Sequence, residues 1–262
     1  MSGLPEPAQG STALVTGASS GIGEQIARAL SARGHHVTLV ARRKERLETL
    51  AQELGNACAM PVDLADASAR ALFMAVVTDA KRDVEVLVNC AGIGVYAPFH
   101  SSDGERELQQ LRVLAEAPLE LTHRWLAAMV KRGRGAVINI SSTSAFQALP
   151  YNAGYAAAKS YLLLLSEALH AEVAEFGVTV TCVCPGPVPT EFQEANEASF
   201  TEKLPKPMWV SAERVAQDAL RGAERSSRVV VPGSALLSAS TIANRYAPRG
   251  VALSIAKRVM AE

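Results

Sequence analysis

Residues Thr12–Gly23 read TALVTGASSGIG, and this stretch decides the fold. A short apolar run ends at Gly17, and residues 23–33 then have helical spacing. Glycine in such a turn permits a close approach of the backbone to a phosphate group. Free N–H groups at the start of the helix, aided by the helix dipole, can then hold a pyrophosphate. A purely structural turn is the alternative, but the strand–turn–helix context favours a dinucleotide site.

The rest of the chain alternates short apolar runs with longer amphipathic ones. Strands are predicted at residues 12–16, 36–40, 57–62, 84–89, 135–141, 178–184 and 228–231. Helices are predicted at residues 23–33, 44–54, 67–81, 104–132, 155–176 and 211–221. This order predicts a single α/β domain over residues 1–262, a doubly wound Rossmann-type parallel sheet of about seven strands with helices on both faces. A substrate lid is expected at about 191–210 and a tail at about 235–262.

Charge and cysteine content exclude some classes of protein. The 262 residues carry 26 Lys and Arg against 26 Asp and Glu, so the net charge is zero and a broadly basic nucleic-acid binder is not expected. The first residues lack a signal-peptide pattern, and no run of about 18 apolar residues occurs, which predicts a soluble, cytoplasmic protein. Cys182 and Cys184 share one face of a strand, where buried thiols are favoured over a metal site, so no metal is predicted.

The spacing TGxxxGIG in the turn resembles the short-chain dehydrogenase/reductase family. The resemblance extends from Thr12 to about Val231, and further motifs follow in the family's order: NCAG at 89–92, NISSTSAF at 139–146, YxxxK at 155–159 and PGPVPT at 185–190. It implies an oxidoreductase that transfers hydride between a nicotinamide cofactor and a carbonyl or secondary alcohol.

The end of the second strand indicates which nicotinamide cofactor is used. An NAD site usually places an acidic residue here, on the ribose 2′-hydroxyl, but none occurs before Glu45. Arg42 and Arg43 are available instead for a 2′-phosphate, which the guanidinium binds through its planar fork of donors. A solvated basic start to a helix is the alternative. The sequence therefore predicts NADP(H) in preference to NAD(H).

The resemblance implies further cofactor contacts after the other strands. Asp63 and Leu64 would contact adenine, although a nearby helix N-cap is an alternative for Asp63. The NCAG segment would flank the adenosine ribose and support the sheet, and the PGPVPT segment would hold the nicotinamide carboxamide. The full cofactor set is Gly17, Ser19, Ser20, Gly21, Ile22, Gly23, Arg42, Arg43, Asp63, Leu64, Asn89, Ala91, Gly92, Tyr155, Lys159, Pro185, Gly186, Val188 and Thr190.

Three residues are predicted to be catalytic. Tyr155 and Lys159 lie four apart on a helix and therefore on one face. A nearby ammonium should lower the tyrosine pKa from about 10 and make the phenol a general acid or base. By the resemblance, Ser142 would bind the substrate carbonyl and stabilise developing negative charge. A serine hydrolase is the alternative for a serine at a strand end, but the chain has no GxSxG turn.

One position departs from the family's pattern. Relatives usually have an asparagine, linked to a proton-carrying water, where this chain has Leu114 within the run VLAEAP at 113–118. Two hypotheses therefore stay open: a working NADP-dependent reductase or dehydrogenase, or a cofactor-binding sensor or scaffold with little catalysis.

Substrate and partners are less closely defined. Phe192, Phe200 and Leu204 in the lid indicate an apolar carbonyl or alcohol substrate. The family usually forms homodimers or homotetramers, and the run Leu162–Leu165 is consistent with that, although core packing explains it equally well. The tail could cap the pocket, join a subunit interface or, as the least favoured option, contact anionic lipid.

Overall fold

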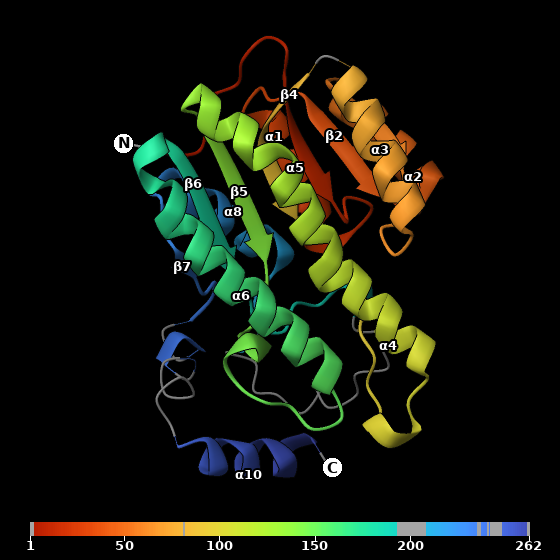
Figure 1. The fold of residues 1–262 in the computed structure, drawn as a ribbon, viewed down its shortest axis with the longest axis vertical. Coiled ribbons are helices and arrows are strands. Elements are labelled where there is room, and N and C mark those ends of the chain that lie inside the picture. Colours follow the sequence, from red (N-terminus) through yellow and green to blue (C-terminus); the bar gives the residue numbers. More distant parts are fainter. Residues whose placement is uncertain are drawn as a thin grey trace.

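The computed structural model describes residues 3–80, 82–192, 208–234, 237–239, 241 and 248–260. A parallel sheet of seven strands in the order β3-β2-β1-β4-β5-β6-β7 runs through it (Figure 1). The strands are β1 (Ser11–Thr16), β2 (Val37–Ala41), β3 (Ala57–Pro61), β4 (Asp83–Asn89), β5 (Gly135–Ile140), β6 (Val178–Val183) and β7 (Val229–Val230). The predicted doubly wound Rossmann-type sheet is thereby confirmed.

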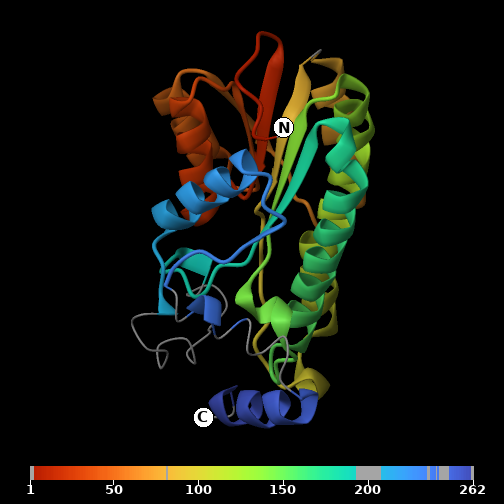
Figure 2. The ribbon, with the colours of Figure 1, turned by 90° about the vertical axis from the view of Figure 1, so that its left-hand side faces the viewer.

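Helices cover both faces of the sheet, as Figure 2 shows from the side. One layer holds α1 (Gly21–Ala32), α2 (Lys44–Leu54) and α8 (Ala212–Glu224), and the other holds α3 (Ala67–Asp79), α5 (Ala117–Arg132) and α6 (Ala153–Val173). Successive strand residues alternate between the two cores, so Ala13 and Val15 pack on the first layer and Leu14 on the second. Because both faces are buried, the central strands are apolar runs with little polar alternation.

The helix predicted at residues 104–132 is not one regular helix. It consists of α4 (Gly104–Leu111), a π-helical turn (Arg112–Glu116) and α5. The N–H of Ala117 donates to the carbonyl of Arg112, five residues back. Pro118 explains the interruption, because its ring nitrogen cannot donate to the carbonyl of Leu114 and its ring crowds that carbonyl in an α-helix. The bulge therefore forms without the family's asparagine.

Arg70 on α3 ties this turn to the rest of the molecule. Its side chain is fully buried, and Nη1 donates to the carbonyl oxygen of Leu64 at 2.7 Å. Nε donates to Glu120 Oε2 on α5 at 2.7 Å, and Nη2 also pairs with Glu116 in the π turn. A buried guanidinium needs such partners, since leaving its charge unpaired would be costly.

Part of the predicted tail forms α10 (Arg249–Met260), which lies beyond the carboxyl ends of the strands, at the bottom of Figure 1. Ala256 is buried there against Leu149 and Ala156, so α10 covers the loops around the start of α6. Within the described part of the chain, no helix is long and apolar enough to cross a membrane. Phe200, Leu204 and most of the predicted lid lie outside the described residues.

Candidate active site

The predicted site residues follow the carboxyl ends of β1 to β6, and these ends meet at one edge of the sheet (Figure 1). The strand order reverses between β1 and β4, because β2 and β3 continue on one side of β1 and the later strands on the other. Ligands of open α/β sheets bind at such a switch point.

The glycine turn between β1 and α1 is packed too closely for side chains. A Cβ on Gly17, which has φ +69°, would lie 2.9 Å from the backbone of Ala91, and one on Gly23 would lie 2.3 Å from the Gly17 carbonyl oxygen. Thr16, at the end of β1, is linked to the segment that follows β4, since its Oγ1 accepts from the N–H groups of Cys90 at 2.9 Å and Ala91 at 3.1 Å. The turn and the NCAG segment are therefore held together.

The PGPVPT segment also reaches this turn. Gly21 has φ +59°, and a Cβ there would lie 3.0 Å from Thr190 Cγ2. Ser20, the N-cap of α1, makes no side-chain capping bond. Helix α1 thus begins beside Thr190, and no side chain caps its first N–H groups. This arrangement suits a helix start that binds phosphate.

Two arginines, Arg43 and Arg46, converge on Glu191 beside the glycine turn. Arg43 donates from Nη2 to the Ser19 and Ser20 hydroxyls at 2.9 and 2.6 Å and from Nη1 to Glu191 Oε2 at 2.6 Å. Arg46 donates from Nη1 to Glu191 Oε1 at 2.7 Å. These hydrogen bonds lower the pKa of Glu191 to about 2. Arg46 was not among the predicted site residues and Glu191 had no predicted role at this site, although Arg43 is the N-cap of α2 and Arg46 lies on its first turn.

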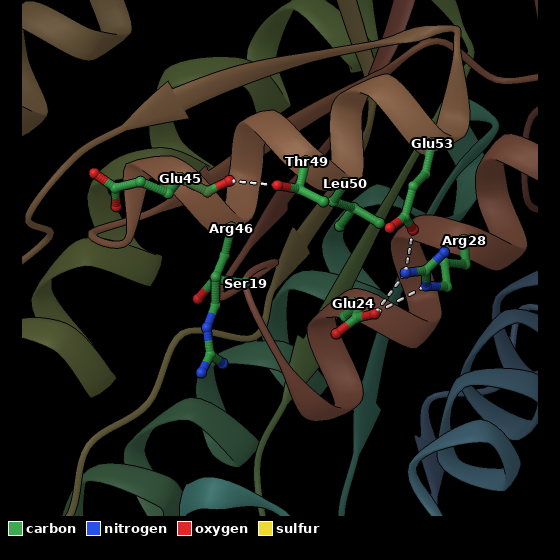
Figure 3. A pocket seen from close by; sticks show the side chains of 8 residues that line it. All are labelled: Ser19, Glu24, Arg28, Glu45, Arg46, Thr49, Leu50 and Glu53. Atoms are coloured by element: carbon green, nitrogen blue, oxygen red, sulfur yellow. Dashed lines mark hydrogen bonds and ion pairs between the residues drawn. The ribbon is translucent and has the colours of Figure 1, made fainter.

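Arg42, the other predicted phosphate ligand, is exposed and has no hydrogen bond or ion pair among the described residues. A hollow of about 290 Å³ lies between α1 and α2 (Figure 3). Ser19 and Arg46 lie at one end of it, and Arg28 bridges Glu24 and Glu53 at the other. The hollow therefore extends the arginine site along α2.

The predicted adenine contacts have structural partners as well. The Asp63 carboxylate accepts from the N–H of Ala65 at 2.9 Å, and the N-cap of α3 is Asp66. Leu64 is buried. The Asn89 amide donates to Asn139 Oδ1 at 2.8 Å and to Thr122 at 3.2 Å, so Asn89 links β4 to β5 and α5. Its predicted role in supporting the sheet agrees with these contacts.

The three predicted catalytic residues lie together. Ser142 follows β5, and Tyr155 and Lys159 are on the first two turns of α6. Ser142 lies close enough to the Tyr155 phenol to lower its pKa, and Lys159 Nζ lies 5.6 Å from the centroid of the tyrosine ring. Lys159 Nζ donates to the carbonyl oxygen of Ile140 at 2.8 Å, and the Ser141 hydroxyl donates to the carbonyl of Lys159. Ser141 thus has a structural role.

The expected lowering of the tyrosine pKa is wrong for this structure. Loss of water around the phenol raises the pKa of Tyr155 to about 12, against a smaller lowering by the hydrogen bond from Ser142. Burial also lowers the pKa of Lys159 to about 8. Desolvation disfavours the charged form of each group and is the largest cause of both pKa shifts.

Phe192 is one reason for this dry environment. Its ring centroid lies 5.9 Å from that of Tyr155, and a Cβ on Gly92 would lie 3.5 Å from its edge. Leu114 is buried with Ala158 beside Tyr155, so its side chain packs where a polar group was expected by the resemblance. The phenol is therefore flanked by apolar groups from three segments of the chain.

The cysteines form no metal cluster within the described residues. Cys182, in β6, and Cys184, just after it, are buried free thiols with their sulfurs 3.8 Å apart, which confirms that they point to the same side of the chain.

Comparison with known proteins identifies the family. Residues 11–199 match the short chain dehydrogenase family model. The chain is 34% identical over 199 residues to a short chain dehydrogenase of Pseudocercospora fijiensis, an alignment that covers 74% of this chain and 64% of that protein. A dehydrogenase/reductase SDR family protein 7-like of Drosophila melanogaster is 34% identical over 190 residues, which cover 70% and 58% of the two chains.

The chain thus spans less than two thirds of the length of these two relatives. The solved structure of a short-chain dehydrogenase from Sphingobium yanoikuyae in complex with NADPH is 30% identical, with a TM-score of 0.77 and coverage of 84% of this chain and 87% of that one. The chain belongs to the short-chain dehydrogenase/reductase family of oxidoreductases.

Proposed function

We propose that the protein is an NADP(H)-dependent reductase of small carbonyl compounds. The observation that carries the proposal is the assembly of Ser142, Tyr155 and Lys159 at the switch-point edge, beside a glycine turn too tight for side chains. A nicotinamide cofactor, when bound, would supply or accept the hydride. The glycine turn would hold its pyrophosphate, and Lys159 and Thr190 lie on the segments expected to hold its nicotinamide end.

The two arginines support a preference for NADP(H). Arg43 and Arg46 already place three hydrogen bonds on one carboxylate, that of Glu191, which shows that their donors can converge on a single anionic group. A 2′-phosphate offers more charge and three acceptor oxygens to the same donors. The known NADPH complex of the Sphingobium yanoikuyae relative is consistent with this assignment.

The protonation of Tyr155 favours carbonyl reduction. A phenol with its pKa near 12 keeps its proton at neutral pH and can donate it to a carbonyl oxygen as negative charge develops there. Ser142 can hydrogen-bond the same oxygen, because it lies beside the phenol and affects its pKa. Lys159 lies close enough to favour the phenolate that remains.

The surroundings of Tyr155 favour an apolar substrate. Leu149 and Tyr151 gather with Tyr96 around Ala156, the residue after Tyr155, and the Tyr96 and Tyr151 ring centroids lie 6.3 Å apart. Phe192 adds a further aromatic face. Apolar walls with few polar groups are typical of sites for small organic ligands.

Tyr155→Phe tests the catalytic assignment. NADPH oxidation is measured over a panel of apolar ketones and aldehydes, with Tyr161→Phe on the exposed side of the same helix as the control. We expect Tyr155→Phe to lower kcat by about 10²–10⁴-fold with NADPH affinity retained, and Tyr161→Phe to leave it unchanged. Equal turnover in wild type and Tyr155→Phe would contradict the proposal, and NADPH binding without turnover on any substrate would favour the non-catalytic alternative.

Arg43→Ala tests the cofactor assignment. It removes the donors to Ser19, Ser20 and Glu191, so we expect NADPH affinity to fall about tenfold more than NADH affinity. Calorimetric titration with both cofactors measures this, and equal losses would exclude Arg43 as a 2′-phosphate ligand.

A further inference from the structure

We propose that Glu191 is a cofactor-discriminating residue, whose carboxylate occupies the arginine site and competes there with the 2′-phosphate of NADP(H). The inference rests on the proposed function and extends it. Nothing in the sequence near β2 indicated an acidic group at this site. The structure brings one there from the segment after β6, on the other side of the β1–β4 switch point, immediately after the PGPVPT segment.

The contacts are those of an anion-binding site filled from within. Glu191 Oε2 accepts from Arg43 Nη1 at 2.6 Å and from Arg46 Nη1 at 2.9 Å, while Oε1 accepts from Arg46 Nη1 at 2.7 Å. Arg43 meanwhile bonds the hydroxyls of Ser19 and Ser20 in the glycine turn. The carboxylate is thus held by the same cations that would receive the 2′-phosphate, at the turn that would receive the pyrophosphate.

The Glu191 carboxylate can be displaced from the two arginines by a phosphate. All three side chains are about half exposed, with 42%, 51% and 46% of the surfaces of Arg43, Arg46 and Glu191 accessible. Ion pairs exposed in this way contribute little to stability. A phosphate carries more negative charge and more acceptor oxygens than a carboxylate, so it can take over the arginines.

The two cofactors would meet this carboxylate differently. NADP(H) must displace Glu191 or place two anions side by side, whereas NAD(H) can leave the Glu191–arginine pairs intact. The ribose 2′-hydroxyl of NAD(H) can also donate to a nearby carboxylate, the role that an acid after β2 has in NAD sites. Glu191 therefore reduces the preference for NADP(H) over NAD(H) that the arginines create.

Glu191→Gln is the direct test, because glutamine keeps the size and shape of the side chain and removes its charge. Calorimetric titration with NADPH and NADH gives the ratio of the two dissociation constants. We expect the ratio to shift toward NADPH by about two- to fivefold, the range that exposed ion pairs allow. Adenosine 2′,5′-bisphosphate should gain affinity in the same variant, which places the effect at the adenosine end, and the shift should shrink as salt is added.

Glu48→Gln is the matched control. It removes one carboxylate from α2, the helix that carries Arg46, where Glu48 pairs with Lys44 at 3.7 Å, and should leave the ratio of dissociation constants unchanged. An unaltered ratio in Glu191→Gln, or an equal shift in Glu48→Gln, overturns the inference. Arg43→Ala distinguishes failure of this inference from failure of the proposed function. If Arg43→Ala lowers the affinity for NADPH more than for NADH and Glu191→Gln leaves the ratio unchanged, the NADP(H) site is supported and the competition by Glu191 is excluded.

Discussion

At the scale of one residue, burial of the Lys159 ammonium in the site lowers the stability of the fold. Burial lowers its pKa to about 8 from a value of 10.5, so the unfolded chain binds more protons than the folded chain between these two pH values. The stability of the wild type therefore rises with pH across that window, and below pH 8 the full cost of burying a charged amine remains. Retention of a lysine at such a place fits a functional need.

Lys159→Met should consequently stabilise the fold while removing activity. Methionine fills similar space without a charge, so we expect the free energy of unfolding at pH 7 to rise by about 1–3 kcal/mol. Part of the gain is lost because the carbonyl of Ile140 loses its donor. Urea denaturation at pH 7 and pH 10 measures the effect, which should shrink at pH 10. Lys131→Met, on the exposed side of α5, is the control, and a destabilised Lys159→Met at pH 7 would contradict the argument.

At the scale of elements, Arg70 is the link between α3, the loop at Leu64 and the π turn. We expect Arg70→Met to lower the free energy of unfolding by about 2–3 kcal/mol, because two carboxylates and one carbonyl lose their donor. Arg124→Met is the control, since Arg124 is exposed on α5 and donates to Thr78 alone among the described residues. Chemical denaturation compares the two, and equal losses would show that Arg70 has no special role.

The same elements show what the sequence could and could not predict. The alternation of short apolar runs with longer amphipathic stretches located all seven strands, because strands buried on both faces differ from amphipathic helices in length and pattern. The π turn escaped prediction, since one extra residue per turn hardly alters helical periodicity over 29 residues. Pro118 was the available signal, because a proline inside a helical pattern commonly interrupts it.

The site was predictable where motifs are local. The glycine turn, Ser142 and the Tyr155–Lys159 pair each lie within a short stretch of sequence. Glu191 was not predictable as a partner of Arg43, because the two are 148 residues apart and meet only through the sheet order. The raised pKa of Tyr155 likewise depends on burial by distant segments, which spacing on one helix cannot reveal.

At the scale of the whole molecule, an exposed apolar surface lies on α4 and α6, which pack together where Gly154 leaves room for Glu107 and Gln110. The run Leu162–Leu165 divides there: Leu162 and Leu163 are buried, whereas Leu164 is 65% exposed. Leu108, Leu111 and Tyr161 are exposed on the same two helices. Several large apolar side chains on neighbouring helices are typical of a subunit interface.

We therefore expect the protein to self-associate through α4 and α6, and Leu164→Glu to break that association. A carboxylate in the centre of an apolar interface would lose its water without gaining a partner. The free energy of this desolvation exceeds what the burial of one leucine side chain contributes to association. Light scattering after size-exclusion chromatography gives the molar mass, which should fall to that of a smaller assembly or a monomer in Leu164→Glu. Leu72→Glu is the matched control, because Leu72 is 68% exposed on α3, outside this surface. A monomeric wild type, or an equal loss of mass in Leu72→Glu, would refute the assignment of this surface.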